Sequence, residues 1–269
     1  MVTFPLAKIN LGLRILRKRA DGYHDLESCL LPVGWRDILE VMESDTFSFQ
    51  ATGLPIPGAT EKNLCVRAYQ LLQQDFALPP VQMYLHKIIP MGAGLGGGSS
   101  DAASMLTTLN ELFALSLDAP ALEAYAAQLG SDCPFFVRNQ PRMVYGTGTT
   151  LEDITLDLSG KHIVLIYPNV AVTTAEAYAG VIPQERDASL REQLETLPLT
   201  DWRDHIGNDF EGSVFQKHPL LATLKDELYQ QGAFYASLSG SGSTLYGLFD
   251  EPVALPDTWQ AYTVWQGTL

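Results

Sequence analysis

The sequence predicts an α+β fold, because strand patterns and helix patterns come in separate blocks and do not alternate strictly along the chain. Strand signals fill the region from Pro5 to Ala51, helical periodicity dominates the middle, and strand patterns return after Gly232. The 269 residues, 46% of them hydrophobic and 18% charged, can bury one large core or two closely packed halves. We expect an N-terminal domain over residues 1–150 and a C-terminal domain over residues 151–269.

The first predicted strand covers residues 5–16, where apolar and polar residues alternate. One face would carry the apolar residues Ile9, Leu11, Leu13 and Ile15. The other face would carry Lys8, Asn10, Gly12 and Arg14. Asp21-Gly22 is a typical hairpin signal, so a returning strand is expected over residues 26–33. Further strands are expected over residues 38–41 and 46–51, which makes this block mostly antiparallel.

Helices are predicted where apolar residues recur at helical spacing. Asn63 can cap a helix that ends near Phe76, and a strand over residues 81–89 follows it. A long helix is expected from Ser99 to Leu115, and another over residues 121–129, ended by Gly130. The remaining expectations are strands over residues 142–144, 162–167, 236–238, 245–249 and 261–265, and a helix over residues 218–231.

Charge and composition exclude several classes of protein. The formal net charge of −14 argues against a nucleic-acid partner, because phosphate contacts require clustered Lys and Arg. No apolar stretch reaches the about 18 residues of a membrane span, and Lys8 interrupts the apolar start that a signal peptide needs. The cysteines and histidines show no metal-ligand spacing, so no metal-binding residue is assigned. We expect a cytoplasmic protein that does not bind membranes.

A glycine-rich segment, PMGAGLGGGSSD from Pro90 to Asp101, joins a predicted strand to a predicted helix. Its five glycines leave a bare backbone that can approach phosphate oxygens and turn N–H groups toward them. The unpaired N–H groups and the dipole of the helix that follows also favour negative charge. The expected nucleotide-phosphate site consists of Pro90, Met91, Gly92, Ala93, Gly94, Leu95, Gly96, Gly97, Gly98, Ser99 and Ser100.

Other nucleotide loops fit this segment less well. It is not a Walker A loop, because no Gly-Lys-Ser/Thr follows the glycines. Gly92, Gly94 and Gly97 match the spacing of a dinucleotide fingerprint, but no second strand ending in an acidic residue follows at the required distance. The sequence also contains neither the HRD nor the DFG signature of protein kinases.

Together with two other segments, the glycine loop resembles the three ordered motifs of the GHMP kinases. The first motif is PLAKINL, which begins at Pro5, and the third is LSGSGSTL, which begins at Leu238. The resemblance covers essentially the whole chain and implies ATP as phosphoryl donor with Mg²⁺. It also implies a two-lobed fold with a strand-rich α/β N-terminal half, an α+β C-terminal half and an active site in the cleft between them.

A narrower resemblance rests on RADGYHDL from Arg19, GLGGGSSDAA from Gly94 and LGSDCP from Leu129. These segments are similar to the 4-diphosphocytidyl-2-C-methyl-D-erythritol kinases of the non-mevalonate isoprenoid pathway. The resemblance implies transfer of phosphate to the tertiary 2-hydroxyl of a cytidine-diphosphate substrate. That substrate and ATP would be the partners of a monomer or weak homodimer.

Cytosine recognition is assigned by this resemblance to three aromatic rings. Tyr23 would stack on the base, His24 would hydrogen-bond its edge, and Tyr178 would stack on the opposite side. From the residues alone, Tyr23 could instead be an exposed hairpin aromatic, and Tyr178 a buried residue of a helix.

The same resemblance assigns catalysis to Asp132 and Lys8. Asp132 follows a predicted helix end and precedes Cys133-Pro134, so we expect it in a fixed turn, where it would accept the substrate's hydroxyl proton. Lys8 would keep that carboxylate ionised and stabilise the developing alkoxide. Taken alone, an Asp beside a helix is more often a cap, and a Lys on a strand is more often solvated.

The remaining site residues follow from the same motifs. Asn63 is expected near adenine, although its capping role explains it equally well. Asp101 could neutralise the helix N-terminus or help to hold Mg²⁺, and we favour the former, because an extra anion beside a triphosphate is costly without a metal. The other expected substrate-binding residues are Asn10, Lys87, Ser239, Gly240, Ser241 and Gly242.

Three alternative functions stay open at this point. Another GHMP kinase, such as a homoserine or sugar kinase, would differ in its acceptor alcohol. A non-catalytic nucleotide sensor on the same fold would not turn over ATP, although the presence of both Lys8 and Asp132 argues against it. An NAD-dependent enzyme would bind nicotinamide.

Overall fold

The computed structural model describes residues 1–269, which pack into two compact units. Unit 1 contains residues 1–7, 35–91 and 96–140, and unit 2 contains residues 8–34, 92–95 and 141–269. The first long strand pair and part of the glycine loop pack with the second half of the chain. The expected domain boundary at residue 150 stays a prediction. Both units combine helices with mainly antiparallel sheets, so the predicted α+β class is confirmed.

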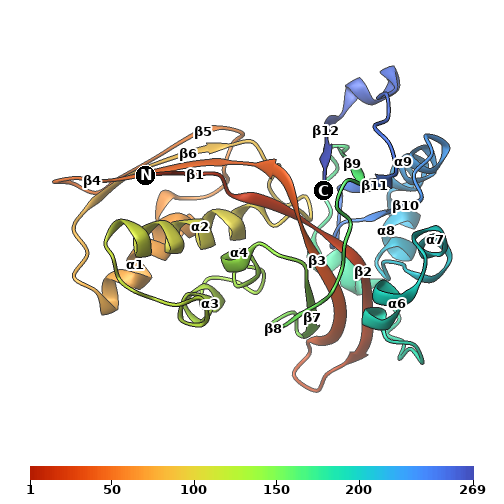
Figure 1. Cartoon of the computed structure of the whole chain (residues 1–269), viewed down its shortest axis with the longest axis horizontal. Coiled ribbons are helices and arrows are strands. Elements are labelled where there is room, and N and C mark those ends of the chain that lie inside the picture. The colour runs from red at the N-terminus through yellow and green to blue at the C-terminus, as the bar shows by residue number, and fades with distance from the viewer. The chain divides into compact units, whose positions relative to one another are not determined.

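Unit 1 is built on one four-stranded sheet with helices on one of its faces (Figure 1). The sheet has the order β1–β4–β6–β5, where only the β5–β6 pair is parallel. Its strands are β1 (Val2–Thr3), β4 (Ile38–Glu43), β5 (Ser48–Gly53) and β6 (Val81–Lys87). Its helices are the 3₁₀ turn η1 (Thr60–Lys62), α1 (Leu64–Asp75), α2 (Gly97–Leu112), α3 (Ala119–Ala127) and α4 (Phe135–Arg138).

The core of unit 1 fixes the position of α2. Alternate residues of β6, namely Val81, Met83 and Leu85, are buried, as expected for a strand with one covered face. Met105 and Leu109 of α2 belong to the same apolar cluster, and α2 also packs against α1, α3 and α4. Because α2 is held on several sides, the place at which its N-terminus emerges is fixed within unit 1.

Unit 2 contains two further four-stranded sheets. The first has the order β2–β3–β7–β8 and consists of β2 (Leu6–Lys18), β3 (His24–Arg36), β7 (Arg142–Gly146) and β8 (Thr150–Asp153), with nearly all of β2 and β3 in unit 2. The second has the order β10–β11–β9–β12 and consists of β9 (His162–Tyr167), β10 (Tyr235–Leu238), β11 (Leu245–Phe249) and β12 (Thr263–Thr268).

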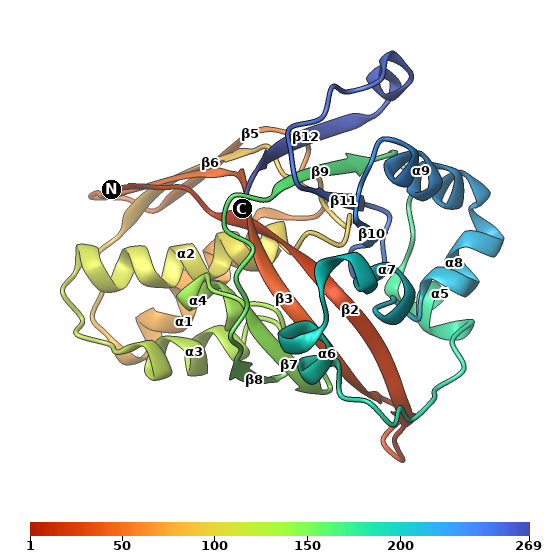
Figure 2. The same ribbon diagram turned by 45° about the vertical axis from the view of Figure 1, so that its right-hand side comes forward.

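Helices cover the second sheet of unit 2. The last long helix, α9, packs on β10 and β11, with α8 beside it (Figure 2). The helical elements of this unit are α5 (Thr174–Ala179), α6 (Leu190–Thr196), η2 (Leu199–Asp201), α7 (Trp202–His205), α8 (Glu211–Lys217), α9 (Pro219–Gln230) and η3 (Asp257–Ala261). No helix in either unit combines the length and apolar character that crossing a membrane requires.

Most predicted elements are present, including the hairpin at Asp21-Gly22 and the helix capped by Asn63, whose side chain accepts a hydrogen bond from the Cys65 N–H at 2.9 Å. The long helix expected from Ser99 begins two residues earlier, at Gly97, directly after Gly96 with its left-handed φ of 69°. The short elements β1, β8 and α4 were not predicted, since segments of two to four residues are too short for a periodic pattern.

The alternation predicted along β2 fails at Gly12. Asn10 hydrogen-bonds Ser28, whereas Arg14 hydrogen-bonds Glu27. Because Glu27 and Ser28 are consecutive strand residues, they point to opposite faces, and so do Asn10 and Arg14. Gly12 has a φ of 66°, a left-handed conformation that glycine adopts readily and that interrupts the pleat. The prediction that Asn10 and Arg14 share a face was therefore wrong.

Candidate active site

A buried chain of hydrogen bonds fixes the first motif. The Lys8 ammonium donates to Asn10 Oδ1 at 2.6 Å, and Asn10 Nδ2 donates to Ser28 Oγ at 2.9 Å. The Ser28 hydroxyl in turn donates to the Gly12 carbonyl at 2.6 Å. Lys8 and Asn10 are only 4% and 6% exposed, so neither is a solvated strand residue. The Asn10 amide has one orientation here, and it holds the Lys8 ammonium in one place.

The first part of the glycine loop, residues 92–95, is joined to the first and third motifs within unit 2. The Lys8 N–H donates to the Leu95 carbonyl at 3.0 Å, and the Thr244 N–H donates to the Ala93 carbonyl at 3.2 Å. A Cβ on Gly94 would lie 2.0 Å from the Ser239 carbonyl oxygen, and the φ of Gly94 is 79°. Only glycine fits at this crossing, which explains one glycine of the motif.

The Ser239 side chain stabilises the contact between the glycine loop and the third motif. It is fully buried, and its hydroxyl donates to the Gly94 carbonyl at 2.8 Å. A substrate contact through Ser239, as predicted, would therefore have to come from its main chain. Gly240 lies beside the first motif, because a Cβ built on it would be 3.5 Å from the Lys8 ammonium and 3.4 Å from Asn10 Oδ1. Three motifs that are distant in the sequence thus meet within unit 2.

In unit 1, the first turn of α2 offers main-chain N–H groups. The Ser100 N–H is the first to bond within the helix, to the Gly96 carbonyl at 2.9 Å, so the N–H groups of Gly97, Gly98 and Ser99 have no intrahelical partner. Gly98 and Ser99 are half-buried and no side chain caps this end. This helix end can receive negatively charged oxygens.

Asp132 lies close to this helix end. It is half-buried and occupies a turn, as predicted, with the Cys133 N–H donating to the Gly130 carbonyl at 3.2 Å. The thiol of Cys133, the next residue, lies near the Ser99 hydroxyl in the first turn of α2. The α2–α4 packing thus brings the turn of Asp132 to the N-terminus of α2 within unit 1.

Lys87 has a different role from the predicted one. Its side chain is fully buried, and its ammonium donates to Asp37 at 2.5 Å and to Asp101 at 2.7 Å. Asp37 also accepts hydrogen bonds from the N–H groups of Ile88 and Ile89. The predicted substrate contact is therefore not available to the Lys87 side chain, because both carboxylates engage it. We call Asp37, Lys87 and Asp101 the buried triad.

The buried triad lies against the N-terminal end of α2. A Cβ on Gly97 would approach the Lys87 ammonium to 2.8 Å, so the missing side chain at Gly97 makes room for the triad. Burial alone would lower the pKa of Lys87, but the two carboxylates outweigh it and raise that pKa. Burial raises the pKa of Asp101 to about 7, and Asp37 adds to this effect while Lys87 opposes it.

The raised pKa of Asp101 predicts a pH-dependent stability. Between about pH 4 and pH 7 the folded protein holds a proton that the unfolded chain releases, so the free energy of unfolding should fall as pH rises through this window. Asp101→Asn removes this titration while keeping the shape of the side chain. We expect the melting temperature of the variant to fall less with pH than that of the wild type. If the melting temperatures of the variant and the wild type change equally between pH 5 and pH 8, Asp101 is not the group that titrates.

The predicted cytosine residues are partly brought together. The rings of His24 and Tyr178 stack with centroids 4.9 Å apart and planes 28° apart, and Phe210 supports Tyr178 edge-on at 4.8 Å. Tyr23, which precedes His24 in the sequence, is 66% exposed. The structure thus joins His24 to Tyr178 and leaves the face of Tyr23 open. The predicted base stacking stays a prediction.

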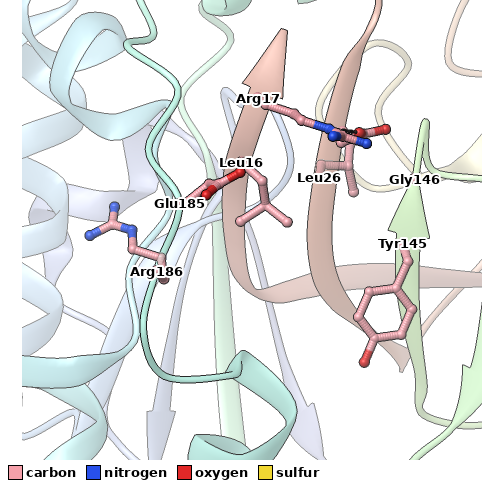
Figure 3. Close-up of a pocket in the computed structure, with 8 residues that line it drawn as sticks. Leu16, Arg17, Leu26, Tyr145, Gly146, Glu185 and Arg186 are labelled. Atoms are coloured by element: carbon pink, nitrogen blue, oxygen red, sulfur yellow. Dashed lines mark hydrogen bonds and ion pairs between the residues drawn. The ribbon is translucent and has the colours of Figure 1, made fainter. Parts of the chain in front are cut away.

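A cavity of about 530 Å³ opens elsewhere in unit 2, at the ends of β2, β3 and β7 (Figure 3). Its residues are Leu16, Arg17, Asp25, Leu26, Tyr145, Gly146, Glu185 and Arg186. Arg17 and Asp25 form an ion pair of 2.5 Å at its rim. None of the predicted site residues lines this cavity, so we do not assign the reaction to it.

Sequence reasoning missed Ser28, Asp37 and Asn208, which position site residues through side-chain hydrogen bonds. Asp37 carried a faint signal, because it is a charged residue just before a strand. Ser28 and Asn208 carried none, since single polar residues in a strand and a loop are common.

Comparisons with known proteins agree with this geometry. Residues 63–140 match the sequence profile described as the GHMP kinases N terminal domain, and residues 190–261 match the GHMP kinases C terminal profile. A 4-diphosphocytidyl-2-C-methyl-D-erythritol kinase of Bacteroides thetaiotaomicron is 50% identical over 262 residues, which cover 96% of this chain and 95% of that protein. The enzyme of the same name from Parabacteroides distasonis is 44% identical, with both chains fully covered.

Solved structures extend the agreement to the fold. A crystal structure of 4-(cytidine 5'-diphospho)-2C-methyl-D-erythritol kinase, 31% identical, has a TM-score of 0.84 and covers 100% of this chain and 98% of its own. Homoserine kinase from Cytophaga hutchinsonii, only 15% identical, shares the fold with a TM-score of 0.64. The match covers 98% of this chain and 94% of that one. With its three motifs meeting as described and its sequence matched over nearly the whole length, the chain belongs to the GHMP kinases and, within them, to the 4-diphosphocytidyl-2-C-methyl-D-erythritol kinases.

Proposed function

We propose that this protein uses ATP to phosphorylate the 2-hydroxyl of 4-diphosphocytidyl-2-C-methyl-D-erythritol. The observation that carries the proposal is the packing of the Lys8–Asn10 pair against Gly240 and Leu95, which joins all three GHMP motifs. The family membership of the chain supplies the acceptor. The two alternative acceptor classes, homoserine and sugars, have no comparable support, because the likeness to homoserine kinase extends to the fold alone.

The reaction follows from the roles of individual groups. The phosphates of ATP bind the free N–H groups of Gly97, Gly98 and Ser99, where the dipole of α2 favours negative charge. Asp132 takes the proton of the substrate's 2-hydroxyl, and the hydroxyl oxygen bonds to the γ-phosphorus of ATP. The bond between the γ-phosphorus and the oxygen that bridges it to the β-phosphate breaks, which releases ADP. Lys8, oriented by Asn10, stabilises the charge on the attacking oxygen.

Magnesium fits this site. Ser100 Oγ and Asp101 Oδ1 are buried in the first turn of α2 and have no hydrogen-bond partner, and hydroxyl and carboxylate oxygens suit Mg²⁺. Ser100, with Asp101, would hold the ion, which would neutralise phosphate charge when bound. The protein would act as a monomer or weak homodimer in the cytoplasm, and its three buried free cysteines suit a reducing compartment.

The direct test of this function is ADP formation in the presence and absence of the cytidine substrate. We expect substrate-dependent ADP release, with homoserine, mevalonate and galactose failing to replace the substrate. ADP release that does not depend on the cytidine substrate, or that homoserine stimulates equally, would exclude the proposed acceptor.

Tyr23 provides a test of base recognition. Its ring is 66% exposed, so Tyr23→Ala should leave the fold intact and remove about 1–3 kcal/mol of stacking energy. We expect weaker binding of the cytidine substrate and unchanged affinity for ATP, both measured by titration calorimetry. Phe4→Ala, which removes a ring that is 54% exposed in unit 1, is the matched control and should change neither affinity. An equal loss for both ligands would reject the stacking role.

A further inference from the structure

The side chain of Asn208 is buried against the third motif. It lies between α7 and α8 and begins the sequence NDFE, whose last residue, Glu211, is the first of α8. It is 5% exposed and belongs to no motif that the sequence identified. Its Nδ2 donates to the carbonyls of Leu238 and Gly240, both at 2.8 Å. Its Oδ1 accepts from the Phe210 N–H at 2.9 Å, which fixes the orientation of the amide. One side chain therefore holds two carbonyls of the third-motif turn.

The neighbouring residues fix Asn208 and the turn from the same segment. The Asp209 N–H donates to the Leu13 carbonyl at 2.8 Å, and the Leu13 N–H donates to the Gly207 carbonyl at 3.0 Å, so the segment is tied to β2. Glu211 Oε1 accepts from the Leu238 N–H at 2.9 Å. Both polar main-chain groups of Leu238 are thus held by the NDFE segment.

The bond to Gly240 determines where the next amide points. In a trans peptide the C=O and the following N–H point in opposite directions, and the peptide between Gly240 and Ser241 is trans. With the Gly240 carbonyl directed to the buried Asn208 amide, the Ser241 N–H points the opposite way. Ser241 is half-buried, and its N–H has no hydrogen-bond partner within the protein.

The place of this N–H indicates its ligand. Gly240 lies beside the Lys8 ammonium, so the Ser241 N–H and the Lys8 ammonium form a small local group of donors in an acidic protein. Such a group suits phosphate oxygens. We propose that Asn208 is a positioning residue that orients the Gly240–Ser241 peptide, so that the Ser241 N–H binds a diphosphate oxygen of the cytidine substrate. This inference rests on the proposed function.

The test compares Asn208→Asp with the wild type in steady-state kinetics. The substituted carboxylate has the same shape but presents oxygen to two carbonyl oxygens, which favours rotation of the peptide. At about pH 8 we expect KM for the cytidine substrate to rise about tenfold or more, while KM for ATP changes less than about twofold. At acidic pH the protonated carboxyl supplies one donor again, so the ratio of the variant's KM to the wild-type KM should decrease.

Asn110→Asp is the matched control. Asn110, at the end of α2 in unit 1, also bonds main-chain groups, donating to the Leu117 carbonyl at 3.1 Å and accepting from the Leu117 N–H at 2.9 Å. It should leave both KM values unchanged. If Asn208→Asp fails to fold, Asn208→Ser, which keeps one donor without a charge, carries the test and should raise KM for the cytidine substrate selectively.

The outcomes separate the two proposals. Wild-type protein that does not turn over the cytidine substrate overturns the proposed function and this inference with it. Wild-type turnover combined with an unchanged KM in Asn208→Asp and Asn208→Ser overturns the inference alone. Equal increases in both KM values, or the same pattern in Asn110→Asp, would show a general effect on folding and would also overturn it.

Discussion

Asp132→Ala is expected to lower the rate of phosphoryl transfer by about 10²–10⁴-fold, the usual contribution of a positioned general base. The variant loses the group that accepts the hydroxyl proton but keeps the first turn of α2, whose N–H groups belong to other residues. ATP affinity should therefore stay near the wild-type value. Single-turnover kinetics measures the transfer step, and titration with a non-hydrolysable ATP analogue measures binding.

The control for this substitution is Asp132→Asn, which keeps the size and most contacts of the side chain but cannot accept a proton at neutral pH. Both variants should be similarly impaired if proton transfer is the lost function. Transfer that survives within tenfold in both variants would remove Asp132 from the mechanism. A simultaneous loss of ATP binding would instead indicate a structural role for the turn before α4.

Lys87→Met is expected to lower the free energy of unfolding by about 3–5 kcal/mol, because it leaves two buried carboxylates without their cation. The methionine fills a similar volume, so lost packing contributes little. Urea denaturation measures the change. The loss should be larger above pH 7 than at pH 5, because burial raises the pKa of Asp101 to about 7 and protonation relieves part of the repulsion.

A surface lysine offers the comparison for Lys87. Lys161 pairs with Asp250 at 2.6 Å, but their side chains are 29% and 68% exposed. Lys161→Met should cost less than about 1 kcal/mol, as is usual for exposed ion pairs. If both substitutions cost the same, the buried triad does not stabilise unit 1 in the way that its geometry indicates.

The sequence revealed the motifs because their composition departs from ordinary loops. Five glycines before a helix have few uses besides close approach of a ligand or another chain segment. The structure adds that Gly94 is required by the Ser239 carbonyl, and Gly97 by the Lys87 ammonium. Part of the glycine content of the loop therefore serves packing within the protein.

The contacts that position the site could not be read in the same way. Lys87 meets Asp37 across 50 residues and Asp101 across 14, and Asn208 meets Gly240 across 32. Such pairs depend on the register of strands and on helix packing, which local periodicity does not specify. For the same reason the lysine just before the glycine loop was expected to contact a ligand, although the fold buries it between two carboxylates.

The change of face at Gly12 has a related cause. Strict alternation was assumed along β2, and a single left-handed glycine reverses it, which separates the face of Asn10 from that of Arg14. Glycine in a strand signals such a change only when its φ is known.

Phosphorus NMR of the reaction product tests the central claim most directly. The 2-carbon of the acceptor carries a methyl group and no hydrogen, so a phosphate on its hydroxyl has no proton three bonds away. We expect one new phosphomonoester resonance without proton splitting, formed in step with ADP. A new resonance split by neighbouring protons, or inorganic phosphate alone, would contradict transfer to the 2-hydroxyl.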